Sequence, residues 1–477
     1  MTSKTKTNFR WVICAMLFVA TAVNYLDRQV LSLTWDEFIK PEFHWNESHY
    51  GTITSLFSII YAICMLFAGR VVDWMGTKKG YLWSIGVWSA GACAHALCGV
   101  VTENIVGLHT AAELVQATGD TAVLISTISM YCFLVARSIL ALGEAGNFPA
   151  AIKTTAEYFP KKDRAFATSI FNAGASIGAL FAPLTIPVLA KNFGWEVSFI
   201  IIGALGFVWM GFWVFLYEKP EKSKYVNGAE LVYIHQDDES PAVETKNEEK
   251  EPQISFLRCF TFRQTWSFIT GKFFTDGVWW FYLFWAPAYF SDQYGYKSSS
   301  SEAIMLIFTL YAIVTVLSIY GGYLPKLFVE KKGMNPYNGR MLSMLIFAFF
   351  PLFALFAQPL GAYSAWWPAI IIGLAGAGHQ AWSANLFSTI GDMFPKSTIA
   401  TITGIGGMAG GIGSFLINKG AGALFTYSEA QGAAFSFLGF DGKEAGYMII
   451  FCICAVAYLV GWVIMKALVP KYKPVVA

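Results

Sequence analysis

Charged residues are scarce in this chain, and their scarcity excludes an ordinary soluble domain. Only 13% of the 477 residues are Asp, Glu, Lys or Arg, whereas soluble domains carry about 25%. Hydrophobic residues make up 56% of the chain, and the mean hydropathy is +0.50. The net charge of +2 does not point to nucleic acid, and we expect no nucleic-acid partner.

Sites for metals, nucleotides and covalent catalysis are also missing from the sequence. The eight cysteines show no metal-ligand spacing, and Cys452 and Cys454 would face apart on a helix. No phosphate-binding G-x-x-x-x-G-K-[ST] loop occurs. We therefore expect no metal, no cofactor and no enzymatic activity, and any energy coupling should use an ion gradient.

Long apolar runs are what the chain has instead, and each is close to the roughly 20 residues that cross a bilayer. The first run lacks a small-residue cleavage site, so we expect it to stay as a membrane span. The predicted class is an all-α polytopic membrane protein in contact with lipid. The predicted spans are 11–33, 50–70, 81–100, 129–157, 165–190, 196–217, 264–290, 301–322, 340–357, 364–391, 399–420 and 446–468.

The spans divide into two halves of six. Residues 1–217 form the first half, 218–262 a polar linker expected to be solvated, and 263–477 the second half. A weak repeat supports this division, because Phe159 and Phe394 lie 235 residues apart, as do Gly178 and Gly413 in glycine-rich runs. Parallel six-span repeats place a binding site between the halves, near the bilayer midplane.

Lysine and arginine gather in the loops on one predicted side of the membrane, for example at Lys78, Lys79, Lys161 and Lys332. By the positive-inside rule, both termini and the linker should be cytoplasmic. An insert at 103–127 carries Glu103, Glu113 and Asp120 but no Lys or Arg, and we expect it to be external and helical.

An acid and a base stand side by side in the first span, at Asp27 and Arg28. Charges at membrane depth usually belong to an ion or substrate pathway. Both lie about 7 Å outward from the centre of the span at 1.5 Å per residue. Glu144 in the fourth span should lie at the same level, so the three side chains are candidates for one site.

Several segments resemble a known family. Residues 69–79, GRVVDWMGTKK, resemble the loop 2–3 signature of the major facilitator superfamily, with Arg70 and Asp73 as structural or gating charges. Residues 24–28, 143–150, 279–287 and 379–385 resemble the anion:cation symporter family, in particular bacterial hexuronate transporters. The resemblance implies the major facilitator fold, with twelve transmembrane helices, and a bacterial inner-membrane location. It also implies proton coupling through Asp27 and Glu144, for which structural salt bridging is the alternative.

Arg28 suits a substrate carboxylate, because its guanidinium keeps its charge and binds carboxylates through two parallel bonds. The alternative is an internal partner, Asp27 or Glu144. Arg137 lies two turns from Glu144 and either exchanges with it or anchors the helix. Lys272 and Asp276 should pair with each other. Packing is the alternative role for the aromatic substrate-binding candidates, and a hydrogen bond between helices is the alternative role for His379. The remaining substrate-binding candidates are Tyr25, Tyr61, Asn172, Trp279, Tyr282, His379, Ser383 and Asn385.

The sequence therefore predicts a monomeric proton-coupled symporter that imports a small sugar-acid anion, such as glucuronate or galacturonate, by alternating access. Aldonates or other organic anions are alternative substrates. Organophosphate/phosphate antiport is disfavoured because it calls for two central cations, whereas Lys272 is expected to be neutralised by Asp276. A sensor would need an effector domain larger than the linker.

Overall fold

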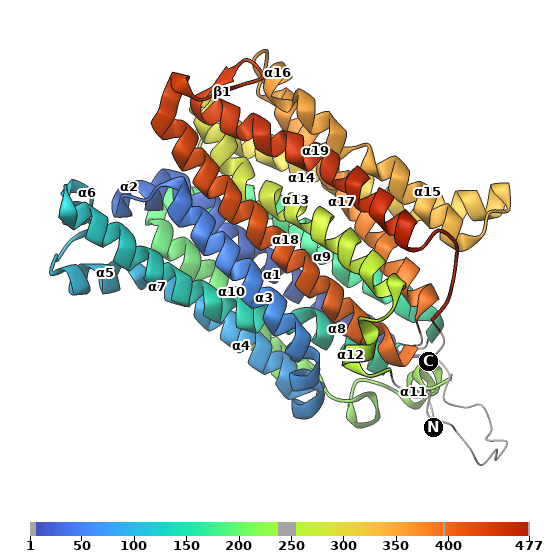
Figure 1. The fold of residues 1–477 in the computed structure, drawn as a ribbon. Helices are drawn as coiled ribbons and strands as arrows, with labels where there is room; N and C mark the ends of the chain where they lie inside the picture. Colours follow the sequence, from blue (N-terminus) through green and yellow to red (C-terminus); the bar gives the residue numbers. More distant parts are fainter. Residues whose placement is uncertain (1–5, 160, 237–253, 395, 476–477) are drawn as a thin grey trace.

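Long helices dominate the structure, a computed structural model that describes residues 6–159, 161–236, 254–394 and 396–475. Most of them run side by side along one axis (Figure 1). Both chain ends lie at one end of this bundle, which we call the termini end, together with α11 and α12. The opposite end, here the distal end, carries α2, α5, α6 and a short β-hairpin.

The first half, called the N half, contains α1 to α10. Their bounds are α1 Phe9–Thr34, the π-helix η1 Trp35–Ile39, α2 Lys40–Phe43, α3 Glu47–Met75, α4 Thr77–His95, α5 Cys98–Val106, α6 Ala111–Gln116, α7 Asp120–Glu144, α8 Asn147–Tyr158, α9 Lys161–Phe193 and α10 Trp195–Leu216. The linker carries the 3-10 helix η2 Pro220–Lys222, α11 Gly228–Ile234 and α12 Phe256–Cys259.

The second half, called the C half, contains the remaining elements. They are α13 Arg263–Tyr294, α14 Ser301–Lys332, α15 Pro336–Ala348, η3 Pro351–Phe356, α16 Ala357–Gly361, α17 Trp366–Met393, α18 Lys396–Gln431, η4 Gly432–Ala434, β1 Ser436–Phe437, β2 Phe440–Asp441 and α19 Gly442–Leu468. The strands pair antiparallel, Ser436 with Asp441.

The helices are consistent with the twelve predicted membrane crossings. Eight stretches in the described part of the chain are long and apolar enough to cross a bilayer, and α4 with α5, bent by 49°, makes a ninth. The helices α13, α17 and α18 are not among these stretches, but at 32, 28 and 36 residues they are long enough to cross. The predicted all-α class with two six-helix halves is confirmed.

The insert at 103–127 extends the bundle at the distal end (Figure 1). It contains the end of α5, all of α6 and the first turns of α7. The fourth crossing thus begins as a helix at Asp120, nine residues before the predicted span at 129. The helix extends to Asp120 because residues 120–128 contain no glycine or proline to interrupt it.

Close backbone contact joins the halves at the distal end, where α3 packs along α18. A Cβ atom on Gly422 would lie 2.6 Å from the carbonyl oxygen of Glu47 and 3.0 Å from the Cα of Gly51. Lys443 of α19 also donates to Glu47 Oε1 at 2.6 Å and to Asp292 Oδ1 at 2.8 Å. The distal end is therefore closed by glycine contact and by an ion pair between the halves.

The first part of the linker is packed against the N half. Glu230 of α11 is fully buried and accepts hydrogen bonds from the backbone N–H groups of Phe9 and Arg10 at 3.0 and 3.2 Å. It also pairs with the Arg10 guanidinium at 2.8 Å. Because Asn8 makes no side-chain cap, Glu230 caps α1 from another part of the chain. Residues 237–253 of the linker lie outside the described residues.

Candidate functional site

Two of the predicted site residues, Arg28 and Glu144, are in contact in the N half. Arg28 of α1 donates to Glu144 Oε2 of α7 through Nε at 2.9 Å and Nη2 at 2.6 Å. The side chains are 3% and 0% exposed. The prediction that the two residues share one level is confirmed. A buried ion pair of this kind is costly to break unless another partner replaces the one that leaves.

Aromatic rings surround the Arg28 guanidinium. Its Cζ lies 4.9 Å from the ring centre of Tyr25, 5.0 Å from Tyr61 and 5.7 Å from Phe57, all in the N half. The Trp280 ring of α13 lies 5.2 Å away and comes from the C half. Ring faces attract cations, so Arg28 is held by a four-ring box to which both halves contribute.

Asp27 and Arg137 lie beside this pair and are almost fully enclosed, at 2% and 1% exposed. Arg137 Nη2 donates to the main-chain oxygen of Arg28 at 3.0 Å. Neither carboxylate oxygen of Asp27 has a hydrogen-bond partner among the described residues, and the same holds for Glu144 Oε1. Arg137 therefore braces the turn that carries Arg28, which fits the predicted anchoring role, while Asp27 is a buried acid beside the indole N–H of Trp88.

The candidates of the C half form a second polar group. Trp279 stacks on His379 of α17, with ring centres 5.3 Å apart and planes 2° apart. His379 Nδ1 lies 2.7 Å from the hydroxyl of Tyr458 in α19. Tyr282 is 3% exposed, and its hydroxyl lies beside the Cys454 thiol of α19. Lys272 and Asp276 pair at 2.6 Å, as predicted.

The remaining candidates lie in different surroundings. Ser383 is half-buried and Asn385 is buried, with its Nδ2 donating to Ala381 O at 2.8 Å, whereas Asn172 of α9 is exposed. Their substrate contacts stay predictions. The side chains of Arg70 and Asp73 lie outside the described part of the structure.

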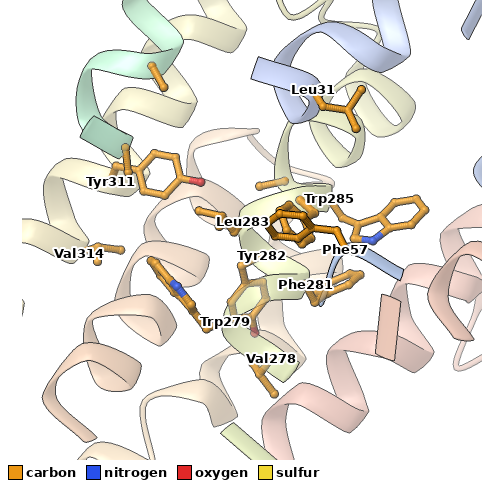
Figure 2. Close-up of a cluster of buried hydrophobic side chains, with 14 of the residues drawn as sticks. Leu31, Phe57, Val278, Trp279, Phe281, Tyr282, Leu283, Trp285, Tyr311 and Val314 are labelled. Atoms are coloured by element: carbon orange, nitrogen blue, oxygen red, sulfur yellow. The ribbon is translucent and has the colours of Figure 1, made fainter. Parts of the chain in front are cut away.

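Two residues at the interface of the halves were not predicted. Trp280, rather than its neighbour Trp279, faces Arg28, and Gln29 Nε2 donates to the Tyr311 hydroxyl of α14 at 2.7 Å. In Figure 2, Trp279 of α13 lies on the side of Tyr311 and Val314, whereas Trp285 lies on the side of Leu31. The sequence offered one signal for Gln29, a polar residue directly after Arg28 inside an apolar run.

Comparison with known proteins identifies the fold family. The model of the Major Facilitator Superfamily matches residues 17–417. The chain belongs to this superfamily. It is a multi-pass membrane transporter and not an enzyme, as predicted.

Curated relatives in this superfamily are similar over most of the chain. A hexuronate transporter of Escherichia coli K12 is 28% identical over 440 residues, which cover 90% of this chain and 92% of the relative. A galacturonate transporter of Dickeya chrysanthemi is 26% identical, with 71% and 87% covered. A probable galactarate/D-glucarate transporter of E. coli K12 is 25% identical, with 93% and 94% covered.

Solved structures of transporters share the fold. A bacterial homologue of the lysosomal transporter Spinster, in an inward-facing and occupied conformation, superimposes with a TM-score of 0.67 at 17% identity, covering 98% of both chains. A D-xylose–proton symporter gives 0.65 at 15% identity, with 95% of this chain and 98% of that chain covered. At these identities the match establishes the fold alone.

Proposed function

We propose that this chain is a proton-coupled symporter that imports a sugar acid, most specifically a hexuronate such as glucuronate or galacturonate. Support for the substrate class comes from the curated relatives named for hexuronate, galacturonate and galactarate/D-glucarate. Support from the structure comes from a buried guanidinium at the interface of the halves, where alternating access needs the site.

Arg28 is the residue that carries this proposal. The four surrounding rings are uncharged and do not neutralise the Arg28 guanidinium. Both hydrogen bonds from Arg28 to Glu144 go to a single carboxylate oxygen. A substrate carboxylate can replace Glu144 on the same nitrogens, because both are planar anions of the same geometry. Trp280, half-buried beside Arg28, offers an apolar face for the C–H groups of a sugar ring.

Proton coupling follows from the exchange at Arg28. Once a substrate carboxylate takes Arg28, Glu144 is left as a buried anion without that partner, which is costly in a low-dielectric interior. Binding of a proton removes the charge. Asp27, which is 2% exposed, is a second carboxyl group to which the same reasoning applies. Substrate and proton would then cross together.

The closed distal end corresponds to one state of the proposed transport cycle. With the termini end in the cytoplasm, as the basic loops predict, the closed distal end faces outward. The halves would rock about the central site as the Glu47–Lys443 contact forms and breaks. We place the protein in a bacterial inner membrane, acting as a monomer.

Aldarates and aldonates are the second candidate substrates. Lys272 is a second buried cation, 7% exposed, in the C half, and a diacid carries a second carboxylate. Its 2.6 Å pair with Asp276 leaves it neutralised, which favours a single-carboxylate substrate. The same pairing argues against organophosphate/phosphate exchange, since a phosphate dianion calls for two available cations.

Uptake by proteoliposomes tests the proposal. Radiolabelled glucuronate and galacturonate are offered with and without an inward proton gradient, to the parent protein, Arg28→Ala and Glu144→Gln. The matched controls, Arg258→Ala and Glu302→Gln, change exposed residues. We expect gradient-driven uptake in the parent and both controls and none in Arg28→Ala.

Counterflow separates binding from coupling. We expect Glu144→Gln to exchange substrate across the membrane without responding to the proton gradient. If folded parent protein transports neither sugar acid, the hexuronate assignment is wrong, and aldarates, aldonates and phosphorylated sugars are tested next. Equal uptake by Arg28→Ala and Arg258→Ala would remove Arg28 from the site.

A further inference from the structure

The Tyr458 hydroxyl lies between two polar groups of the C half. It is 2.7 Å from His379 Nδ1 and 3.2 Å from the main-chain oxygen of Thr275 in α13. Tyr458 is fully buried. A phenol has one proton to donate, a carbonyl oxygen accepts only, and a neutral imidazole has one donor and one acceptor nitrogen.

Only one assignment of protons satisfies both contacts. If Tyr458 donates to Thr275 O, the phenol oxygen accepts from a protonated Nδ1 of His379. If Tyr458 instead donated to Nδ1, its oxygen lone pairs would face the Thr275 carbonyl oxygen at 3.2 Å with no proton between them. Unsatisfied polar contacts are costly in a buried site. Both hydrogen bonds therefore require the Nδ1–H tautomer.

The imidazole is uncharged in this arrangement. Asp276, the residue after Thr275, is already paired with Lys272 at 2.6 Å. Burying an imidazolium without a carboxylate partner costs far more than burying the neutral ring. The stacked Trp279 ring, 2° from parallel, holds the imidazole plane, and Tyr458 fixes its rotation about the bond to the ring.

We infer that Tyr458 is a positioning residue that makes His379 Nε2 a fixed hydrogen-bond acceptor for a substrate hydroxyl. Nε2 has no protein partner among the described residues, and His379 is 5% exposed. A lone pair at this atom accepts from a sugar hydroxyl and repels a carboxylate. Resting on the proposed function, this assigns the carboxylate of the sugar acid to Arg28 and a hydroxyl to the C half.

The two proposed contact groups flank adjacent residues of α13. Trp280 contacts Arg28 at 5.2 Å and the adjacent Trp279 contacts His379 at 5.3 Å. The cationic group belongs to the N half and the neutral acceptor to the C half. A hydroxy acid can therefore contact both halves in one orientation only, whereas a simple carboxylate without hydroxyl groups contacts the N half alone.

Nitrogen NMR of 15N-histidine-labelled protein tests the assignment without any substrate. The signal of His379 is identified by its loss in His379→Gln, since the chain has six histidines. We expect Nδ1 protonated and Nε2 unprotonated in the parent. Tyr458→Phe should move the proton toward Nε2. A parent spectrum with Nε2 protonated overturns the inference.

Sugar-acid uptake is the second test of the inference. Tyr458→Phe should raise the half-saturating sugar-acid concentration about threefold to tenfold, the loss of one well-placed hydrogen bond, and leave the maximal rate near that of the parent. Tyr337→Phe is the control, since it also removes a bond from a buried phenol to a main-chain oxygen, that of Val469. Equal effects of the two variants would reduce Tyr458 to a structural role. The expected spectrum in a protein that transports no sugar acid would refute the proposed function and leave the tautomer assignment standing.

Discussion

Adding one methyl group at Gly422 should open the distal end. The Cβ of Gly422→Ala would lie 2.6 Å from Glu47 O and 3.0 Å from the Cα of Gly51, while comfortable carbon contacts lie at about 3.5–4.0 Å. The halves must separate by about 1 Å to accommodate it. This strain exists only while α3 and α18 touch, so it destabilises the distal-closed state and not the open one.

Overpacking by a single group costs about 1–3 kcal/mol. An equilibrium between closed and open distal ends would shift by about 5- to 150-fold for that free energy. Gly420→Ala is the matched control, because a Cβ there meets no atom within 4 Å. Both variants gain the same helix propensity from alanine, so their difference isolates the contact between the halves.

The assay is labelling of a cysteine placed at Ser58, which is fully buried 2.8 Å from Ser414 across the same interface. A membrane-impermeant maleimide is applied from the distal side, and labelling is measured against the same background without Ser58→Cys. We expect Gly422→Ala to label faster than Gly420→Ala by a factor within the range above. Equal rates would show that the glycine contact does not hold the distal end closed.

Three further outcomes follow from contacts described above. Glu230→Ala should lower the unfolding temperature, measured by a thermal-shift assay, strongly relative to the exposed control Glu302→Ala, because losing one partner of a buried pair costs about 3–5 kcal/mol. Equal unfolding temperatures of the two variants would show that the cap on α1 is dispensable. Glu47→Gln and Lys443→Met should each raise distal labelling, and the double variant should add less than their sum, while strict additivity would show that the two side chains are not coupled. Trp280→Phe should keep sugar-acid uptake close to the parent and Trp280→Leu should lose most of it, since a ring face is what Arg28 contacts; similar uptake by both variants would exclude that contact.

The sequence could predict how deep in the membrane the charged residues lie, but it could not predict the rotation of every helix about its axis. Arg28 and Glu144 could be placed together because an ion at membrane depth must find a partner, and rise per residue fixes its level. Helix α13 gave no such constraint, because residues 278–285 are aromatic or aliphatic on all sides. Whether Trp279 or Trp280 faces Arg28 depends on a 100° step that only packing between helices decides.

Contacts between residues far apart in the sequence could not be predicted, for a different reason. Glu230 lies in a charged stretch that resembles solvated linker, and its partner Arg10 is 220 residues away. No local periodicity joins the two positions. The Tyr458–His379 contact is similar, since it spans 79 residues and its importance rests on one hydroxyl proton, which no sequence pattern encodes.

The buried Glu230 also determines where the chain can be split into two separately expressed fragments. A plasmid that ends the first polypeptide at residue 217, the last of the predicted N half, would leave the start of α1 and the buried Arg10 guanidinium without their carboxylate. One that continues through residue 236 keeps α11 with the helix it caps. Co-expression of two separate fragments should therefore restore uptake only when the junction follows α11, which makes this short helix the proper last element of the first fragment.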